Sequence, residues 1–537
     1  MLLVNKKFRN KSLHKSNPQN KIGEPILEKQ IDRYFWLIIP LLTIVYYYIS
    51  NISVGFYQDD EIAQYINMID FWHDPFIILG NAPKPGYKIF MVLPALIGYD
   101  AVLLMNSLIA SLAVFLSYKL LKAYEVQYAF LGAVLLALQP LFFDLSFRSY
   151  SEIFTALLVA ILLLSYKRQH YFLAALTGGY IFTVRQEFAL FLIVFIVILL
   201  RDKRYIALSG MIIFPLLYDL LGFMKTGDIL FILSEMQKVA GLEYQSQGLF
   251  HYFRVYVYII GPVSLLLFAY GFFGFIQDTS KVKEYLVKYL LFYVIFVSIF
   301  IAQVLTMIND GPNPGNWRYL LHLSPVCVFF ATLGFNKLAD DKFRNSGYIL
   351  AGVIVFFTLL FSSKKTDGFK LLDQPDFTNL FIIIAAFILT LIMSRQSVRS
   401  YLDKLSISMI VLAVISLLIL FEPRQLSQEN AAMKSIAEKL DSYEKIDSKT
   451  VLANHSFLKF YSGAYKNNPS NFGSIESSRL NELNPGSIVV WESHYGYRPE
   501  WGLDVNLPEL QDTTRFDLLD QLITPDKKFA AFIFQKK

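Results

Sequence analysis

The sequence predicts an all-α polytopic membrane protein with about thirteen transmembrane helices, followed by a small α/β domain outside the cytoplasm. Hydrophobic residues make up 55% of the 537 residues. Charged residues make up only 17%, below the roughly 25% that is usual in soluble domains. Long apolar runs recur up to about residue 421, and the composition becomes polar and mixed after them. The 48 phenylalanines and 33 tyrosines suit lipid-facing helices and the aromatic belts at membrane interfaces.

The predicted spans follow a basic N-terminal segment, residues 1–33, which has no small-residue cleavage site. We expect it to remain attached as a cytoplasmic signal anchor. The apolar runs fall at 34–50, 101–121, 127–144, 151–166, 171–184, 188–200, 205–222, 254–276, 285–307, 318–335, 347–362, 378–393 and 406–421. Several are shorter than the roughly 20 residues that a helix needs to cross a bilayer, so we expect some to be tilted, broken or sunk into the bundle.

The basic loops agree with this order of spans. With residues 1–33 in the cytoplasm, six short basic turns fall on the cytoplasmic side, as the positive-inside rule requires. They contain Lys119 and Lys122; Lys167 and Arg168; Arg201, Lys203 and Arg204; Lys281, Lys283 and Lys288; Lys337, Lys342 and Arg344; and Arg395, Arg399 and Lys404. The loop 363–377, with three lysines, is the exception. An odd number of spans places the C-terminal part outside.

Three domains result: the basic segment 1–33, a transmembrane domain 34–423 whose first outside loop is 51–100, and an extracytoplasmic domain 424–537. In the last of these we expect a helix at 428–446 and strands at 450–453, 487–491 and 529–534. This domain carries no recognisable chemical motif, and its simplest interpretation is a lid or structural cap.

The net charge of +6 does not indicate a nucleic-acid partner, because the positive residues stand in short loops where they set topology. The single cysteine, Cys327, excludes an intramolecular disulfide and a cysteine-based zinc cluster. The histidines His73, His251 and His322 are scattered and interpreted as structural, since they show no zinc-ligand spacing.

The first outside loop carries the strongest chemical signal. Asp59, Asp60 and Glu61 follow one another directly after the first span. Acids next to a membrane face are costly to bury and are often functional. They can accept a proton from an acceptor hydroxyl or hold a divalent cation. The alternative is a solvated helix start, with Asp59 as N-cap and the acids facing the helix dipole.

A stiff turn follows in the same loop. Segment 61–79 is amphipathic and suited to the membrane surface. Pro83 and Pro85 then fix the chain around Lys84. A lysine held on such a turn can bind a phosphate as a point charge, whereas an ordinary loop lysine is the alternative.

This arrangement resembles the membrane glycosyltransferases of the C-type fold, which use lipid-linked sugar donors. The stretch Asp60-Glu61-Ile62-Ala63-Gln64 is similar to the Asp-Glu-x-x-Gln of mannosyltransferases of the GPI-anchor and dolichol pathways. The segment from Asp60 through Lys84-Pro85 and Tyr87 resembles the matching segment of the lipid A aminoarabinose transferases, and protein O-mannosyltransferases share the plan. The local resemblance covers about the first 190 residues. The oligosaccharyltransferase signature Trp-Trp-Asp-Tyr-Gly is not found.

The resemblance implies an inverting glycosyltransferase that moves a sugar, such as mannose or a related hexose or pentose, from a polyprenyl-phosphate donor. The acceptor would be a hydroxyl of a lipid, glycan or protein at the outer face of the membrane. It implies Asp60 as the catalytic base, with Asp59 and Glu61 as supports or alternates, and Lys84 as a cation for the leaving phosphate.

The outside turns supply further candidates. Arg185 and Arg318 stand at the outer face, where they can bind the donor phosphate or simply reach the interface as snorkelling side chains. Further substrate contacts are expected from Arg148, Glu152, Glu187 and Tyr87. We expect no cofactor and no metal, although a divalent cation at the acidic loop is left as an alternative.

Two other functions compete with transfer. A transporter or flippase of a lipid-linked sugar would also have many spans, but inverted repeats and charges in mid-span are then expected and are not evident. A scaffold or sensor would leave the acidic loop unexplained. The expected location is a bacterial inner membrane, with the site facing outward and membrane lipids as surroundings.

Overall fold

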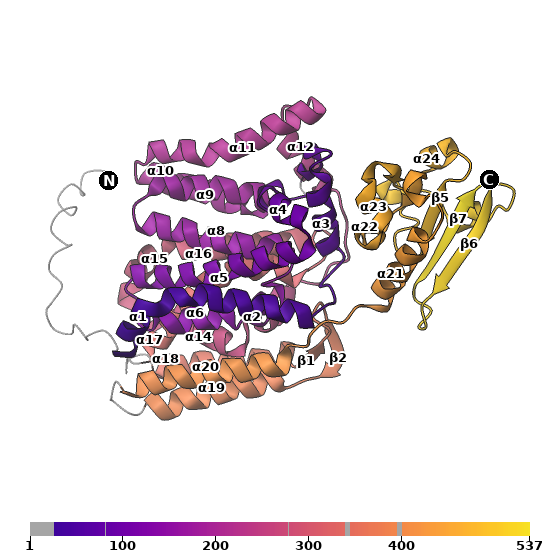
Figure 1. Cartoon of the computed structure of the whole chain (residues 1–537). Coiled ribbons are helices and arrows are strands. Elements are labelled where there is room, and N and C mark those ends of the chain that lie inside the picture. Colours follow the sequence, from indigo (N-terminus) through magenta and orange to yellow (C-terminus); the bar gives the residue numbers. More distant parts are fainter. Residues whose placement is uncertain (1–25, 81, 278, 339–343, 395–399) are drawn as a thin grey trace.

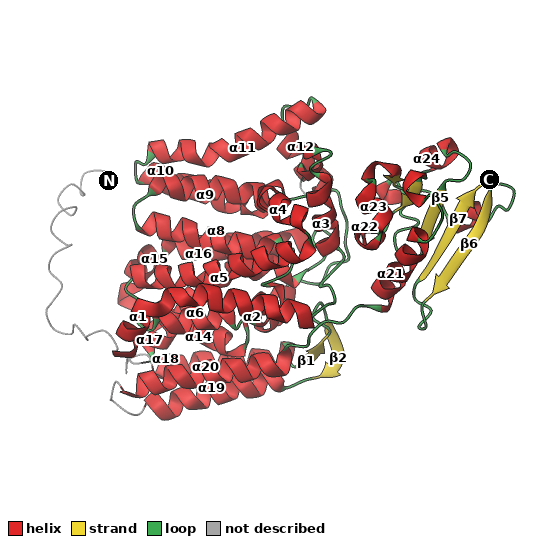
Figure 2. Cartoon of the chain, in the orientation of Figure 1, coloured by secondary structure: helices red, strands yellow, loops and turns green. Residues whose placement is uncertain are grey.

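The computed structural model describes residues 26–80, 82–277, 279–338, 344–394 and 400–537. It consists of a bundle of helices with a separate α/β domain at one end (Figure 1). Strands are confined to this domain and to one hairpin among the described residues (Figure 2). Most of the predicted basic N-terminal segment, residues 1–25, lies outside the described part of the chain.

The bundle contains helices α1 to α20. Their bounds are α1 (Ile26–Tyr34), α2 (Ile38–Ile52), α3 (Asp60–Asp70), α4 (Pro85–Ile97), α5 (Tyr99–Ala123), α6 (Ala129–Ala137), α7 (Pro140–Leu145), α8 (Ser151–Lys167), α9 (Tyr171–Val184), α10 (Ala189–Arg201), α11 (Tyr205–Thr226), α12 (Phe231–Ala240), α13 (His251–Ile260), α14 (Pro262–Phe272), α15 (Val282–Lys288), α16 (Leu290–Met307), α17 (Ser324–Lys337), α18 (Arg344–Phe361), α19 (Thr378–Ser394) and α20 (Ser400–Leu420). All thirteen predicted apolar runs are helical.

The number of spans is not confirmed at thirteen. Within the described residues, six helices are long and apolar enough to cross a membrane, or up to seven if one bent pair counts as a span. Four further apolar helices are shorter: Pro85–Ile97, Tyr171–Val184, Ser346–Phe361 and Thr378–Ile392. The predicted run 254–276 is the bent pair, because Gly261 and Pro262 break it into α13 and α14 at an angle of 114°. Pro262 supplies no backbone N–H to continue α13.

Close helix packing depends on small residues, as expected where lipid removes the hydrophobic drive between helices. An added Cβ at Gly271 of α14 would lie 1.7 Å from the carbonyl oxygen of Phe330 in α17. An added Cβ at Gly334 of α17 would lie 2.1 Å from the carbonyl oxygen of Leu267 in α14. Helices α14 and α17 therefore meet backbone to backbone.

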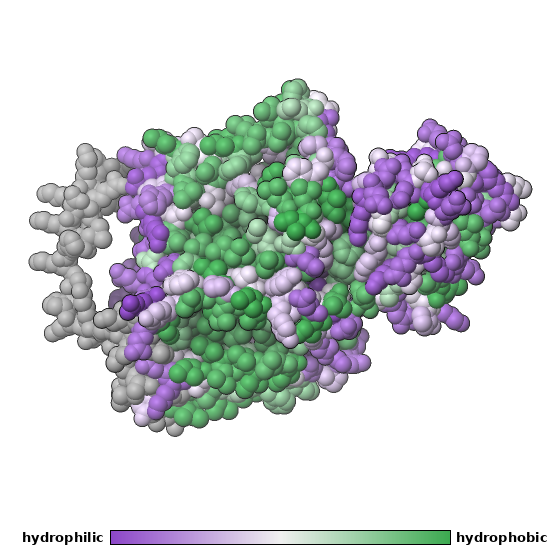
Figure 3. All heavy atoms as spheres, in the orientation of Figure 1, coloured by the Kyte–Doolittle hydropathy of each residue, from purple (hydrophilic) through white to green (hydrophobic). Residues whose placement is uncertain are grey.

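The bundle has an apolar belt between two polar ends, visible in Figure 3. The turn between α10 and α11 lies at the end away from the α/β domain (Figure 1). The hairpin of β1 (Lys364–Thr366) and β2 (Leu371–Pro375) lies at the end next to it. The lysine-bearing loop that breaks the positive-inside pattern is thus on the same side as the C-terminal domain. This is an integral membrane protein.

The C-terminal domain has a five-stranded mixed sheet in the order β4-β3-β5-β7-β6. The strands are β3 (Val451–Ala453), β4 (Phe472–Gly473), β5 (Ile488–Glu492), β6 (Phe516–Ile523) and β7 (Ala530–Lys536). Around them stand α21 (Gln428–Asp441), α22 (Ser456–Tyr461), α23 (Gly463–Asn467), α24 (Ser477–Glu482) and α25 (Leu507–Leu510). The central strand β5 is buried along its whole length, which explains its nearly continuous apolar sequence.

The C-terminal domain contacts the bundle through the first outside loop. Phe457 of α22 packs edge-on against Phe56, with ring centroids 4.7 Å apart. The Tyr465 hydroxyl donates to the Asp70 carboxylate at 2.6 Å. This loop therefore lies between the bundle and the C-terminal domain.

Candidate active site

The three acids of the first loop stand at the start of α3, and their side chains have different surroundings. Glu61 is almost fully buried, at 1% exposure. Its carboxylate accepts from the Tyr99 hydroxyl at 2.7 Å and from the Tyr57 backbone N–H at 3.0 Å, and it pairs with Arg148 at 3.4 Å. All of its partners are protein groups that hold the loop in place.

Asp60 is the acid that solvent reaches. Its side chain is 58% exposed, and it pairs with Arg318. The Arg318 guanidinium also donates to Gln58 at 3.1 Å and to Glu152 at 3.1 Å. Asp60 is thus held from one side by a buried cation and remains open on the other.

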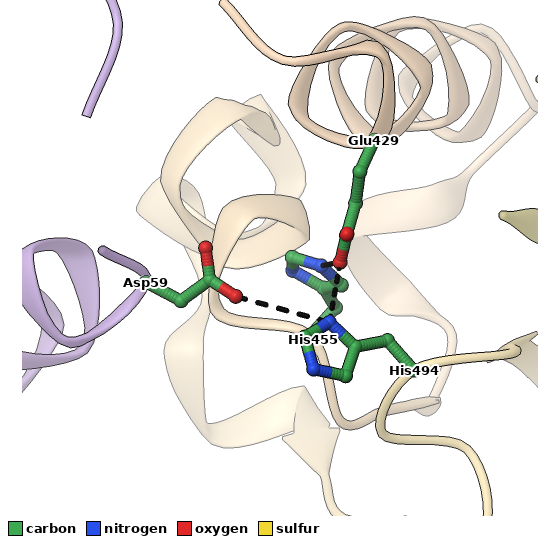
Figure 4. Close-up of side chains that lie close together, drawn as sticks. All are labelled: Asp59, Glu429, His455 and His494. Atoms are coloured by element: carbon green, nitrogen blue, oxygen red, sulfur yellow. Dashed lines mark hydrogen bonds and ion pairs between the residues drawn. The ribbon is translucent and has the colours of Figure 1, made fainter. Parts of the chain in front are cut away.

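Asp59 points toward the C-terminal domain. It occupies the N-cap position of α3, but its side chain makes no cap hydrogen bond, so the capping alternative does not describe it. Its carboxylate accepts from the Tyr495 hydroxyl at 2.8 Å and lies 3.9 Å from His494 Nδ1. Figure 4 shows it facing a group of C-terminal side chains. Sequence reasoning missed these partners.

A buried chain of ion pairs leads away from Asp60. Glu152, at the start of α8, accepts from Arg318 at 3.1 Å and from Arg185 at 3.0 Å. Arg185 also pairs with Glu187 at 2.7 Å. Burial alone would raise the pKa of Glu187, but Arg185, His322, Lys84 and a backbone hydrogen bond together outweigh burial and lower that pKa to about 2. The structure therefore brings together Asp60, Arg318, Glu152, Arg185 and Glu187.

Lys84 belongs to the same charged cluster. Its pKa is lowered to about 8, first by burial and then by the positive charge of Arg185, while Glu187 and Glu152 act in the opposite direction. Lys84 adopts a left-handed conformation, with φ of 59°. This conformation is strained for a residue other than glycine, and such strain occurs often at functional sites.

The neighbouring residues of α4 fix Lys84 in place. Gly86 approaches α9 so closely that an added Cβ would lie 2.2 Å from Thr183 Oγ1. The Tyr180 hydroxyl of α9 donates to the Gly86 carbonyl at 2.5 Å. Because Arg185 directly follows α9, this contact brings Lys84 next to Arg185.

A second lysine beside the cluster, Lys88 of α4, was not predicted from the sequence. Lys88 has 0% exposure, and its Nζ has no hydrogen-bond partner among the described residues. It is electrostatically coupled to Lys84, Asp60 and Asp70. A buried ammonium without an acceptor is costly. Its place within an apolar run, four residues after Lys84, was the available signal.

Arg148 and Tyr87 do not face solvent. Arg148 is buried and donates to the Gly55 carbonyl at 2.7 Å and to Ser53 at 2.9 Å. Tyr87 is fully buried and shares a hydrogen bond with Asn106 at 3.0 Å. The geometry favours bracing roles for both residues over direct substrate contact.

The chain has the C-type glycosyltransferase fold. In this fold it resembles two crystal structures of ArnT from Cupriavidus metallidurans, one bound to undecaprenyl phosphate and one in the apo state. Each superposes with a TM-score of 0.57 at 11% sequence identity, covering 94% of this chain and 98% of the ArnT chain. No protein-family model matches the chain, and no curated protein does.

Proposed function

We propose that the protein is an inverting glycosyltransferase that moves a sugar from a polyprenyl-phosphate donor to an acceptor hydroxyl at the outer face of the membrane. The observation that carries the proposal is the exposed Asp60 carboxylate, paired with Arg318 beside a cluster of buried cations. The C-type fold and the undecaprenyl phosphate bound to ArnT support a lipid phosphate as the carrier.

Asp60 is the proposed base because it combines charge with access. Glu61 is enclosed by protein donors, and Asp59 is turned toward Tyr495. The acceptor oxygen attacks the anomeric carbon from the face opposite the phosphate and passes its proton to Asp60. The bond from that carbon to the phosphate oxygen breaks, and its electron pair stays on the phosphate.

The leaving phosphate gains negative charge and needs fixed cations. Lys84, Arg185 and Arg318 are the proposed phosphate-binding side chains, and Lys88 is added to them because its buried Nζ has no hydrogen-bond partner among the described residues. Arg318 links the proposed base to the buried ion pairs, since it pairs with both Asp60 and Glu152. On donor binding, Arg318 would turn from Asp60 to the phosphate and release the base for the acceptor.

The remaining assignments follow the resemblance. The sugar is proposed to be mannose or a related hexose or pentose, and the acceptor a lipid, glycan or protein. Transfer would take place at the outer face of a bacterial inner membrane, where the first loop and the C-terminal domain would lie.

The deciding experiment is single-turnover transfer from a radiolabelled polyprenyl-phosphate sugar in detergent. Asp60→Asn keeps the shape but cannot take the proton, so we expect a loss of about 10²–10⁴ in rate. Asp373→Asn is the matched control, because Asp373 lies on the hairpin at the same end and its side chain is 99% exposed. Wild-type turnover by Asp60→Asn would remove Asp60 from this role. In a separate assay, movement of the lipid-linked sugar across the membrane of reconstituted vesicles, without sugar transfer, would favour the flippase alternative.

A further inference from the structure

Four side chains of metal-binding residue types, from two distant parts of the chain, meet beside the candidate base. Asp59 comes from the first loop, and Glu429, His455 and His494 come from the C-terminal domain (Figure 4). One ligand atom from each lies within 4.8 Å of all the others. Asp59, Glu429 and His494 are partly exposed and His455 is buried, so an ion can enter from the solvent side.

We infer that this cluster binds a divalent transition-metal ion, best matched by Zn²⁺, which fastens the C-terminal domain to the loop that carries Asp60. The inference departs from the sequence-based expectation of no metal. The proposed site takes only Asp59 from the three loop acids. Its other ligands come from the C-terminal domain, in which the sequence shows no metal-binding motif.

The separations among three of the side chains suit a small ion. Glu429 Oε1 lies 2.7 Å from His494 Nδ1, and Asp59 Oδ2 lies 3.9 Å from the same nitrogen. Zinc bonds of about 2.0–2.2 Å in tetrahedral geometry place ligand atoms roughly 3.3 Å apart. Shifts of about half an ångström bring both distances to that value, which is within reach of side-chain torsions.

His455 acts behind Glu429 and is not a direct ligand. Its Nδ1 accepts the Phe457 backbone N–H at 3.3 Å, so the neutral ring carries its proton on Nε2. Nε2 therefore donates to Glu429 Oε1 at 3.0 Å. This leaves Asp59, Glu429 and His494 as ligands, with a water molecule completing a four-coordinate site.

Both carboxylate ligands have the outer partners that metal-binding carboxylates commonly have. Tyr495 donates to Asp59 at 2.8 Å, and His455 donates to Glu429. The Tyr495 ring also stacks on His494, with centroids 4.0 Å apart. These contacts orient all three ligands before an ion arrives.

The inference goes beyond the proposed function and is tested without it, because the measurement is metal binding to the full-length protein. The detergent-purified chain is stripped with EDTA, passed through gel filtration and titrated with Zn²⁺ against a chromophoric chelator. We expect one Zn²⁺ per chain, and a rise in the thermal unfolding midpoint on adding Zn²⁺.

Variants separate a metal site from a metal-free network of hydrogen bonds. Glu429→Gln and His494→Ala should abolish stoichiometric binding, and Asp59→Asn should weaken it strongly. His494→Cys should retain binding, because a thiolate ligates zinc but does not replace the imidazole hydrogen bond. His455→Gln, which removes an orienting partner, should weaken binding by about 10–100-fold. His73→Ala is the control, since His73 is an exposed histidine of the same loop.

Two outcomes overturn the inference. One is a wild-type chain that takes up no stoichiometric Zn²⁺ and shows no thermal shift. The other is binding that survives Glu429→Gln and His494→Ala together. Loss of transfer by Asp60→Asn with metal binding intact would leave the two proposals independently supported.

Discussion

At the scale of single residues, the three consecutive acids of the first loop differ because their partners differ. Glu61 is bound by Tyr99, Tyr57 and Arg148, Asp60 by Arg318, and Asp59 by Tyr495. Adjacent carboxylates in one short segment thus divide into a structural anchor, an accessible base and a contact with another domain. Substitutions at these positions should affect stability and activity in different proportions.

Glu61→Gln should destabilise the protein more than Asp60→Asn does. Glu61 and Asp144 together compensate the charges of Arg148 and Arg424, all buried or partly buried. Removing one partner of a buried pair costs about 3–5 kcal/mol. The Asp60 carboxylate is mostly solvent-exposed, and without it Arg318 still pairs with Glu152, so we expect a smaller loss of stability.

The free energy of unfolding of both variants is measured in the same detergent, with the helical circular-dichroism signal as the readout. Equal destabilisation by the two substitutions would contradict this division between anchor and base.

The pH dependence of donor binding should report Lys84. Its pKa is lowered to about 8 by burial and by the charge of Arg185, so Lys84 is positive below that pH and neutral above it. The value of kcat/KM for the donor should therefore fall as pH rises above about 8, approaching tenfold per pH unit if this charge is essential. Saturating donor should hide the effect in kcat, because kcat reports groups in the bound complex.

Lys84→Arg is the control for this profile. Arginine remains charged throughout the range, so the decline near pH 8 should disappear even if the absolute rate is lower. An unchanged decline in Lys84→Arg would assign the titration to another group.

At the scale of elements, the docking of α4 on α9 positions the cations. Gly86→Ala would place a Cβ 2.2 Å from Thr183 Oγ1 and 2.7 Å from Val184 Cγ2. Overpacking of this kind costs typically about 1–3 kcal/mol, and it would move Lys84 away from Arg185. We expect a raised KM for the donor together with reduced thermal stability.

The matched control is Gly352→Ala, in helix α18. An added Cβ there meets nothing within 4 Å, so alanine should be neutral or slightly stabilising. If Gly86→Ala behaves like this control, the α4–α9 contact does not position Lys84.

The elements of the bundle could be predicted because each apolar run carries its own signal. Local sequence patterns likewise identified the loop acids and Lys84. It could not locate partners that folding brings from far away: Arg318 is 258 residues from Asp60, and Tyr495 is 436 residues from Asp59. Lys88 was hidden within an apolar run. The break at Gly261 had a local signal, the Gly261-Pro262 pair, which the apolar run around it concealed. The edge strand β6, only partly buried, was missed because periodicity does not reveal tertiary pairing.

At the scale of the whole molecule, the C-terminal domain is more than an attached cap. The segment that leads to it is fixed at the site, since Arg424 pairs with Asp144 at 2.7 Å and its carbonyl accepts from Gly55 at 2.8 Å. The domain itself contacts the first loop through Tyr465, Phe457 and Tyr495. Bundle, loop and domain therefore form one continuous set of contacts around Asp60.

The orientation of the whole molecule in the membrane gives the last prediction. The α10–α11 turn and the C-terminal domain lie at opposite ends of the apolar belt, whereas the β1–β2 hairpin lies beside the domain (Figures 1 and 3). Lys203, Lys365 and Thr450 are exposed, and the native Cys327 is buried. Lys365→Cys and Thr450→Cys should therefore react with a membrane-impermeant maleimide in intact cells or spheroplasts. Lys203→Cys should react only after permeabilisation, because its basic turn is expected in the cytoplasm. The unsubstituted protein controls for Cys327. Labelling of all three sites under the same condition would refute this orientation, and labelling of Lys365→Cys with Lys203→Cys would place the hairpin on the cytoplasmic side.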